Sequence, residues 1–392
     1  MHVLLFWSKK KTVARQDDIV VSLVIQSLCI TWFITKIVCW KLWMAERLFP
    51  LAPPVDFFIA PQAVHLLLFC FSLCLMLVLI FKPLHKKLQV FLFITEVLAC
   101  LLDQSRWQPW EYQFIFILFI NISTAGDKTK ILSAVAFIMI CTYVYSGIGK
   151  FNQGFLYIIW DQMFLKRFFK LSTALIQTNI VHYSGYIMAI TELVMGTALF
   201  FKRTQKTAAW LLILMHLFIL VVVGPFPFSL HYNTSVWPWN ILMIFHLYIL
   251  FINRQQEIKI ERLWIGWTKL VVILWGIMPL LNHTLGWWDN FLSSRLFAGN
   301  QPQMVLCIKD SAELKQLQPY LIKNDPYKLC DGTAYVHLQL WSMKELNSPC
   351  YIEERVYKKV SDKWISTHTG SSTKAILYYI DDRGKITNSQ SK

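Results

Sequence analysis

The sequence predicts an all-α polytopic membrane protein, a bundle of about nine transmembrane helices, followed by a small α+β or β-rich C-terminal domain. Three observations support this fold class. Of the 392 residues, 56% are hydrophobic and only 16% are charged, whereas soluble domains carry about 25% charged residues. The apolar residues form blocks of roughly 17 to 22, long enough to cross a bilayer core of about 30 Å as a helix. Only residues 289–392 are polar throughout.

The composition excludes two classes of protein. The chain is too apolar to be intrinsically disordered, and the length of its apolar blocks argues against a single soluble globule. A formal net charge of +15 would suggest nucleic-acid binding in a soluble protein. Here the basic residues lie between apolar blocks, which is typical of membrane topology, so we expect a lipid bilayer and no nucleic acid as partner.

Nine apolar blocks are predicted to cross the bilayer. Each is apolar around its whole circumference, so each must face lipid or lie inside a bundle. In chain order they are Ile19–Trp40, Gln62–Phe81, Leu88–Leu102, Pro109–Ala125, Ile131–Ile148, Ser184–Phe201, Thr207–Val223, Val236–Ile252 and Leu263–Leu281.

The loops between the blocks predict an orientation. Basic residues gather on the side of the N-terminus, which includes Lys9–Lys11 and Arg15, whereas the opposite loop Gly224–Ser235 has none. This bias favours a cytoplasmic N-terminus, and an odd number of spans then places the C-terminus outside the cytoplasm. The first block has no small-residue cleavage pattern after it, so we expect it to be retained. The predicted location is the bacterial cytoplasmic (inner) membrane.

The polar C-terminal region contains short alternating runs at Ala334–Trp341, Tyr351–Val360 and Lys374–Ile380. Alternation of this kind predicts β-strands. The region also holds three cysteines, an odd number, which allows one disulfide and one free thiol. Their pairing cannot be read from sequence. The three are Cys307, Cys330 and Cys350.

Four ionisable side chains lie near the middle of predicted spans: Glu96, Glu192, His216 and His246. Such groups are expensive in lipid and should face the bundle interior in pairs. Glu192 and His216 belong to consecutive spans, so we expect them to be in contact. The cluster could relay protons, recognise a polar ligand, or hold helices together by hydrogen bonds. No His and carboxylate spacing matches a metal motif, and we predict no metal site.

Another set of candidate residues maps to the predicted outer face. Aromatic residues there could form a rigid mouth over a ligand pocket, with Arg106 as its charged group. They could equally be anchors in the membrane interface. The residues of this candidate pocket are Arg106, Trp110, Trp237, Trp239 and Asn240, together with Glu96 and His246.

Two segments in the middle of the chain stand out. Residues 145–150 read Tyr-Ser-Gly-Ile-Gly-Lys at the end of an apolar block, and the glycines Gly147 and Gly149 permit close helix approach. Residues 185–196 carry Glu192 between two glycines, and the basic turn Lys202-Arg203 follows.

This pattern resembles the DoxX-like membrane proteins and the related HTTM domain of vitamin K-dependent gamma-carboxylase. The resemblance covers residues 131–252 and implies a four-helix core. In the carboxylase a lysine at the matching position is the base that activates a reduced quinone, which implies that role for Lys150. Lysine can act as a base when desolvated, but Lys150 could instead extend to the lipid headgroups. The chain lacks the large lumenal β domain of the carboxylase, so we do not expect carboxylation of protein glutamates.

Two functions remain open at this stage. The first is a quinone-associated membrane oxidoreductase or carboxylase-like enzyme, with Lys150, Glu192 and His216 as catalytic residues and a quinone or lipid-like ligand. The second is a non-catalytic membrane subunit that anchors or matures an exported protein partner. The predicted regions are 1–18 (cytoplasmic N-terminus), 19–130 (N-terminal transmembrane helices), 131–252 (DoxX/HTTM-like core), 253–288 (last transmembrane helix) and 289–392 (extracytoplasmic domain).

Overall fold

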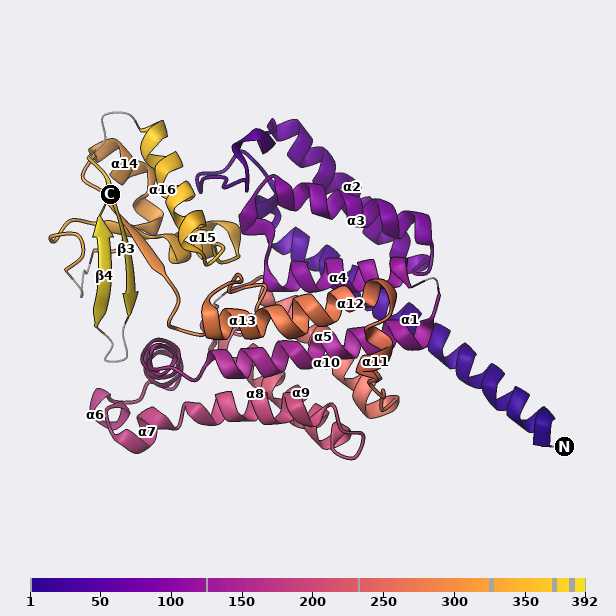
Figure 1. The fold of residues 1–392 in the computed structure, drawn as a ribbon. Coiled ribbons are helices and arrows are strands. Elements are labelled where there is room, and N and C mark those ends of the chain that lie inside the picture. The colour runs from indigo at the N-terminus through magenta and orange to yellow at the C-terminus, as the bar shows by residue number, and fades with distance from the viewer. Residues whose placement is uncertain are drawn as a thin grey trace.

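The computed structural model describes residues 2–124, 126–231, 233–323, 328–368, 372–380 and 385–391, without the side chains of 2–15 and 387–391. The chain is mostly helical. Long helices run side by side in one bundle, and a small sheet with three helices lies at one end of it (Figure 1). The basic side chains Lys9–Lys11 and Arg15 fall outside this description, as do Ala125 at the end of the fourth predicted block and the last residue of the chain.

The first half of the bundle follows the predicted blocks closely. Its five helices are mostly apolar, with charged residues near the starts of α1, α3 and α5, and short polar or proline-containing turns separate them. They are α1 (His2–Val38), α2 (Gln62–Phe81), α3 (Lys86–Leu101), α4 (Pro109–Ser123) and α5 (Lys128–Gly149).

The second half begins with a segment of one π-helix and two short α-helices. It consists of the π-helix η4 (Phe155–Phe168) and the short helices α6 (Thr173–Ile176) and α7 (Asn179–Tyr183). Long helices follow: α8 (Tyr186–Ala198), α9 (Gln205–Val223), and α10 (Val236–Leu247), which continues as η5 (Tyr248–Asn253). After α11 (Ile260–Leu263), the last helical stretch combines η6 (Gly266–Thr268), α12 (Lys269–Val271), η7 (Val272–Ile277) and α13 (Met278–Leu285).

Six helical stretches in the described chain are long and apolar enough to cross a membrane: Gln16–Val38, Gln62–Phe81, Lys128–Gly149, Gln205–Val223, Val236–Asn253 and Gly266–Leu285. The prediction of nine spans is therefore not confirmed. The other three predicted blocks are helical, but α3, α4 and α8 have only 16, 15 and 13 residues. At about 1.5 Å per residue, these helices rise less than the bilayer core.

The three shorter helices have different surroundings. Helix α4 lies inside the protein, and most of its residues are buried. Helices α3 and α8 each expose one apolar face, which includes Phe91 on α3 and Ile187 on α8. Apolar surface of this kind is typical of contact with lipid.

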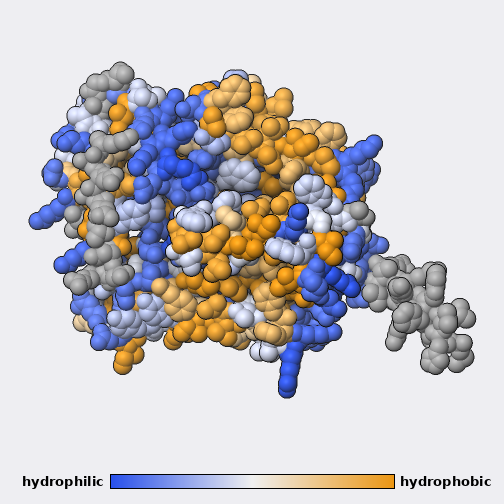
Figure 2. Space-filling view, viewed as in Figure 1, coloured by the Kyte–Doolittle hydropathy of each residue, from blue (hydrophilic) through white to orange (hydrophobic). Residues whose placement is uncertain are grey.

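The helix ends gather at two faces of the bundle. At the face nearest the start of α1, Arg254 forms an ion pair with Asp17, and Lys128 Nζ lies 3.3 Å from Asp18 Oδ1. At the opposite face, Asn347 Nδ2 donates to the Val38 carbonyl (2.9 Å). The space-filling view shows an apolar surface over the helices with hydrophilic surface at both ends (Figure 2).

The C-terminal region is an α+β unit built on an antiparallel sheet of strand order β2-β1-β3-β4. The strands are β1 (Gln303–Cys307), β2 (Tyr335–His337), β3 (Lys374–Ile380) and β4 (Ile386–Ser391). The helices are α14 (Ser311–Gln316), α15 (Leu338–Leu346) and α16 (Glu354–Thr367).

Of the three predicted strands, only Lys374–Ile380 is confirmed. Ala334–Trp341 is a strand for three residues and then becomes helix α15. The prediction of a strand at Tyr351–Val360 is wrong, because most of that run belongs to helix α16. The buried residues Val356, Val360 and Trp364 are four apart, which is the spacing of one helix face. The predicted run Tyr351–Val360 does not reveal this four-residue spacing because it ends before Trp364.

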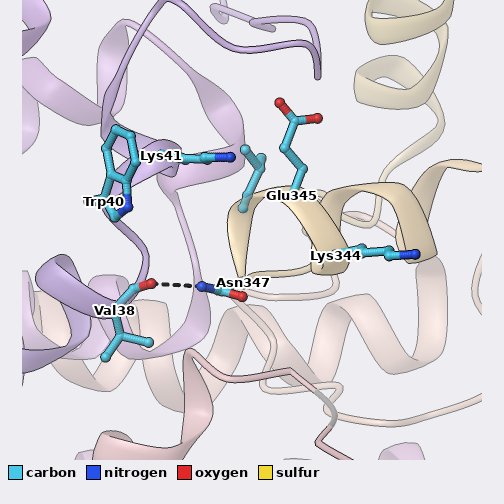
Figure 3. Close-up of a pocket in the computed structure, with 7 residues that line it drawn as sticks. Val38, Trp40, Lys41, Lys344, Glu345 and Asn347 are labelled. Carbon is cyan, nitrogen blue, oxygen red and sulfur yellow. Dashed lines mark hydrogen bonds between the residues drawn. The ribbon is translucent and has the colours of Figure 1, made fainter. Parts of the chain in front are cut away.

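The C-terminal region packs directly on the bundle. The carboxylate of Glu345 accepts hydrogen bonds from the backbone N–H groups of Leu48 (2.7 Å) and Phe49 (3.1 Å). Trp341 packs edge-on against the Phe49 ring. A hollow of about 180 Å³ lies at this junction and is lined by Lys41, Glu345 and Asn347 among others (Figure 3). One hydrophobic core therefore runs from the helices into the sheet.

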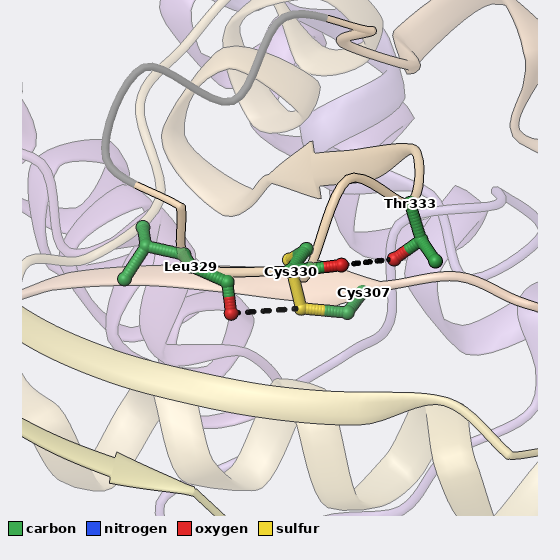
Figure 4. The surroundings of a disulfide bond; sticks show 4 residues. All are labelled: Cys307, Leu329, Cys330 and Thr333. Carbon is green, nitrogen blue, oxygen red and sulfur yellow. Dashed lines mark hydrogen bonds between the residues drawn. A yellow bond between two sulfur atoms is a disulfide. The ribbon is translucent and has the colours of Figure 1, made fainter.

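A disulfide joins Cys307 at the end of β1 to Cys330 in the loop before β2 (Figure 4). Thr333 Oγ1 donates to the Cys330 carbonyl (2.6 Å) and holds the loop in place. Cys350 is a buried free thiol. The prediction that three cysteines allow one disulfide and one free thiol is confirmed, and the structure assigns the pair.

Candidate intramembrane polar site

Helices α5 and α8 approach each other closely because both have a glycine at their contact. A Cβ atom on Gly147 would lie 2.6 Å from the Leu193 nitrogen and 2.9 Å from the Ala189 oxygen. A Cβ atom on Gly196 would lie 2.8 Å from the Cβ of Tyr143. Any side chain at these positions would push the helices apart. Gly147 and Gly196 thus set the spacing of α5 and α8. Gly149, which was also expected to permit close helix approach, lies against His283 and Arg295 instead.

This spacing brings Lys150, directly after α5, to Glu192 on α8. The Lys150 Nζ lies 2.7 Å from Glu192 Oε2, and it also donates to the hydroxyl (2.6 Å) and carbonyl (3.2 Å) of Ser146. Both charged side chains are buried, with Lys150 3% and Glu192 4% exposed. Lys150 therefore points into the bundle rather than to the lipid headgroups. In a low-dielectric interior, the charged pair and its neutral form, with the proton on Glu192, lie closer in energy than in water.

His216 on α9 belongs to a neighbouring group of polar side chains. Its Nδ1 lies 2.6 Å from Asn240 Oδ1, and its Nε2 lies 2.7 Å from the Tyr143 hydroxyl. Asn240 Nδ2 donates to the Val236 carbonyl, so its oxygen must accept from His216 Nδ1. In a neutral imidazole, Nε2 then accepts the Tyr143 proton. Helices α5, α9 and α10 are joined through this histidine.

The expected contact between Glu192 and His216 is not formed. Among the described residues, the Glu192 carboxylate pairs with Lys150, while His216 bonds to Tyr143 and Asn240. The close approach of α5 and α8 explains this, because it places Lys150 within reach of the carboxylate. Glu192 remains in electrostatic range of both His216 and Tyr143. The three predicted catalytic residues thus form two adjacent groups.

The predicted pocket residues on α10 make contacts between helices. Trp239 Nε1 donates to Gln113 Oε1 on α4 (2.7 Å), and His246 Nε2 lies 3.1 Å from Ser27 Oγ on α1. Trp237 is half-buried. These contacts tie α10 to the first half of the bundle.

The remaining predicted residues lie elsewhere, among α1 to α4. Glu96 forms an ion pair with Lys36 (2.7 Å). Trp110 is fully buried. Arg106 is buried as well and donates to the backbone carbonyls of Leu42, Trp43 and Ala99. The ten predicted residues are therefore not brought into one pocket.

Sequence reasoning missed two of the buried charges, Lys36 and Glu111. Both are fully buried, and both lie inside predicted spans. A charged residue within an apolar block could have identified them in the sequence. Lys36 and Glu111 each lie near the end of a block, however, where charged side chains are usually solvated.

The segment from η4 to α7 carries a further pair. His182 Nδ1 lies 2.7 Å from Asp161 Oδ2, and His182 Nε2 lies 3.2 Å from Gln153 Oε1. Burial raises the pKa of Asp161, and the hydrogen bond from His182 acts in the opposite direction. The pair fastens α7 to η4.

The architecture and its buried charges define a class. Apolar helices lie between two polar faces, and the charges inside the bundle have partners. These are the properties of an integral membrane protein of the helical type.

The chain belongs to a family of transmembrane proteins of unknown function, DUF3556, whose model matches residues 108–328. The match spans more than half of the chain. It includes Lys150, Glu192 and His216 and leaves Lys36 and Glu96 outside. Neither the DoxX nor the HTTM family matches, so the resemblance expected from sequence is not shown. No curated protein and no solved structure matches the chain.

Proposed function

We propose that this membrane protein is a quinone-associated enzyme, in which Lys150 and Glu192 exchange a proton with a bound quinone-type ligand. The observation that carries this proposal is the buried Lys150–Glu192 pair, with a distance of 2.7 Å between Nζ and Oε2. Ionisable residues inside a membrane bundle are rare and typically functional.

The pair has the chemistry that a phenolic ligand requires. Transfer of the lysine proton to Glu192 leaves a neutral amine and a neutral acid, and a neutral amine can accept the proton of a reduced quinone hydroxyl. The net charge of the pair is zero in both forms, which suits a site within lipid. His216 would contribute through its hydrogen bond with the Tyr143 hydroxyl. The Glu192 carboxylate is in electrostatic range of this hydroxyl.

Aromatic side chains beside the pair support a planar ligand. Phe151 directly follows Lys150 and stacks on Tyr186, with 5.8 Å between ring centroids; Tyr186 in turn stacks on Tyr183 at 6.2 Å. Phe151 and Tyr183 are 45% and 49% exposed. Such rings favour offset stacking with a planar aromatic head group arriving from the lipid.

The orientation belongs to the same proposal. We place the face with Lys150 and the C-terminal region outside the cytoplasm and the start of α1 inside, in a bacterial cytoplasmic membrane. The loop charges favour this orientation. The Cys307–Cys330 disulfide also supports it, because disulfides persist in oxidising compartments.

The alternative, an anchor for an exported protein, has less support. The C-terminal region that would dock the partner already directs contacts at the chain's own helices, through Glu345, Asn347 and Pro349.

The proposal can be tested by measuring how tightly decylubiquinone binds to the protein in nanodiscs. Quenching of tryptophan fluorescence reports the binding. The test variant is Lys150→Met with Glu192→Leu. It replaces the pair by apolar side chains of similar size, a change that buried ion pairs often tolerate. We expect it to fold and to bind at least about tenfold more weakly.

The matched control is Asp17→Asn with Arg254→Met, which removes an ion pair at the opposite face. It should bind decylubiquinone like the native protein. Equal affinity in the Lys150/Glu192 double variant, or no saturable binding by the native protein, would contradict the proposed function.

A further inference from the structure

A second polar cluster lies among α1 to α4, outside the site described above. Lys36 on α1 is its centre: Nζ lies 2.7 Å from Glu96 Oε2 on α3 and 2.8 Å from Ser72 Oγ on α2. The ammonium group also lies 3.6 Å from the ring centroid of Trp43, a cation–π contact. Lys36, Ser72 and Glu96 are fully buried.

Two carboxyl groups meet in this cluster. Glu111 on α4 is fully buried and accepts a hydrogen bond from Trp32 Nε1 (2.7 Å). Cys100 Sγ lies 4.0 Å from Glu111 Oε1, and the Glu111 carboxyl is in electrostatic range of the Glu96 carboxyl. An ionised carboxylate only accepts hydrogen bonds. The two groups can therefore bond to each other only when one of them carries a proton.

Positive charge around the pair does not remove the need for that proton. Within the described chain, Lys36 is the one cation within 4.0 Å of Glu96, and no ion pair is formed by Glu111. Arg106 donates to backbone carbonyls and to His65 Nδ1 (2.6 Å), while Asp103 pairs with Arg47. The ionisable or polar groups that face the pair are Trp32 and Lys36 from α1, Ser72 from α2, Cys100 from α3, and Arg106 from the segment between α3 and α4.

Two polar atoms of the cluster lack a hydrogen-bond partner among the described residues. They are Oε1 of Glu96 and Nε1 of Trp43, and both are buried. One is an acceptor and the other a donor. Buried polar atoms are normally satisfied by the protein or by a small polar ligand such as water. Oε1 of Glu96 is therefore available to accept a hydrogen bond from a protonated carboxyl group.

We propose that the Glu96–Glu111 carboxyl pair is a proton-binding site inside the bundle, occupied by one proton while Lys36 carries its charge. One positive charge then balances one negative charge. Release of the proton would leave two carboxylates beside a single lysine, which a low-dielectric interior disfavours. This site is independent of the proposed quinone site. Two of its residues, Lys36 and Glu96, lie outside the region matched by the family model, residues 108–328.

Infrared difference spectroscopy of the full-length protein in nanodiscs tests the proposal, because a protonated carboxylic acid has its own C=O stretching band that shifts in deuterated water. The native protein should show one buried acid at neutral pH. Glu111→Gln should abolish the band. The new amide can still accept from Trp32 and can donate to Glu96, so this variant should fold.

A second variant separates the proposal from a simple ion pair. Lys36→Met removes the one cation that the described chain places within 4.0 Å of Glu96, so Glu96 should become protonated too and the band should grow about twofold. Glu313→Gln is the control, because that buried carboxylate accepts from Trp364 Nε1 (2.7 Å) and Thr373 Oγ1 (2.9 Å). It should leave the band unchanged. No buried acid in the native protein, or an unchanged band in Glu111→Gln, would overturn the proposal.

Discussion

The two polar clusters of the bundle hold the same residue types in different proportions. Between α5 and α8, one lysine meets one glutamate, Lys150 with Glu192. Among α1 to α4, one lysine meets two glutamates, Lys36 with Glu96 and Glu111. The first group can be neutral with every side chain ionised. The second is neutral only with one proton bound.

The comparison also teaches how each cluster is built. Lys150 reaches Glu192 because glycines bring two helices together, so the pair depends on backbone geometry. Lys36 contacts side chains of two other helices, α2 and α3, and an indole ring. Glycine substitution should thus affect the first cluster, whereas carboxyl substitution distinguishes the two.

The largest effect is expected from Glu192→Gln. It leaves the Lys150 charge buried without a carboxylate, which should cost about 3–5 kcal/mol of unfolding free energy. Lys150→Met combined with Glu192→Leu should recover most of that loss, because no charge remains unpaired. Denaturant unfolding in mild detergent measures both. A double variant as unstable as Glu192→Gln would show that the charge is not the cause.

Gly147→Ala should have the next largest effect. The added methyl group would meet the backbone of Leu193 and Ala189, and overpacking of this kind costs about 1–3 kcal/mol. Gly149→Ala is the control, since its nearest neighbour is the flexible His283 side chain at 3.3 Å. Thermal unfolding should rank Gly147→Ala below Gly149→Ala, and the reverse order would contradict the packing argument.

Glu111→Gln should destabilise the protein less than Glu192→Gln. It removes a group that we propose to be uncharged, so no buried charge loses its partner, and the expected loss is about 1 kcal/mol or less. The same Glu-to-Gln change therefore has unequal effects in the two clusters. Equal destabilisation by Glu111→Gln and Glu192→Gln would show that both carboxylates are ionised.

Asp161 provides the smallest effect, outside the spanning helices. Burial raises the pKa of Asp161 in the folded state. The protonated form thus stabilises the fold fully below the ordinary pKa of about 3.9, and this contribution is lost as the pH rises through the raised pKa. Asp161→Asn should flatten the dependence of melting temperature on pH across that acid range. An unchanged pH profile would show that the carboxyl group does not titrate with folding.

Much of the helical architecture could be predicted from the sequence, because apolar blocks mark their own limits. The block Gln62–Phe81 coincides with α2. Helix length separates the six confirmed candidate spans from the other three predicted blocks. Helix α8, for example, is apolar but has only 13 residues, which is too short to cross a bilayer core. The strand predicted at Tyr351–Val360 failed because a short alternating run also fits one turn of an amphipathic helix.

The candidate site was partly within reach of sequence. The glycines before Lys150 suggested close helix approach, and at Gly147 the structure shows the contact that results. The pairing of Glu96 with Lys36 and Glu111 could not be foreseen, because these residues lie on three helices whose neighbours depend on packing. Sequence alone gives no register between helices.

One measurement tests the difference between the clusters most directly: the infrared band of the buried protonated acid, compared in Glu111→Gln and Glu192→Gln at neutral pH. We predict that the band disappears in Glu111→Gln and remains in Glu192→Gln, because only the cluster with two glutamates holds a proton. Loss of the band in Glu192→Gln, with retention in Glu111→Gln, would contradict the account.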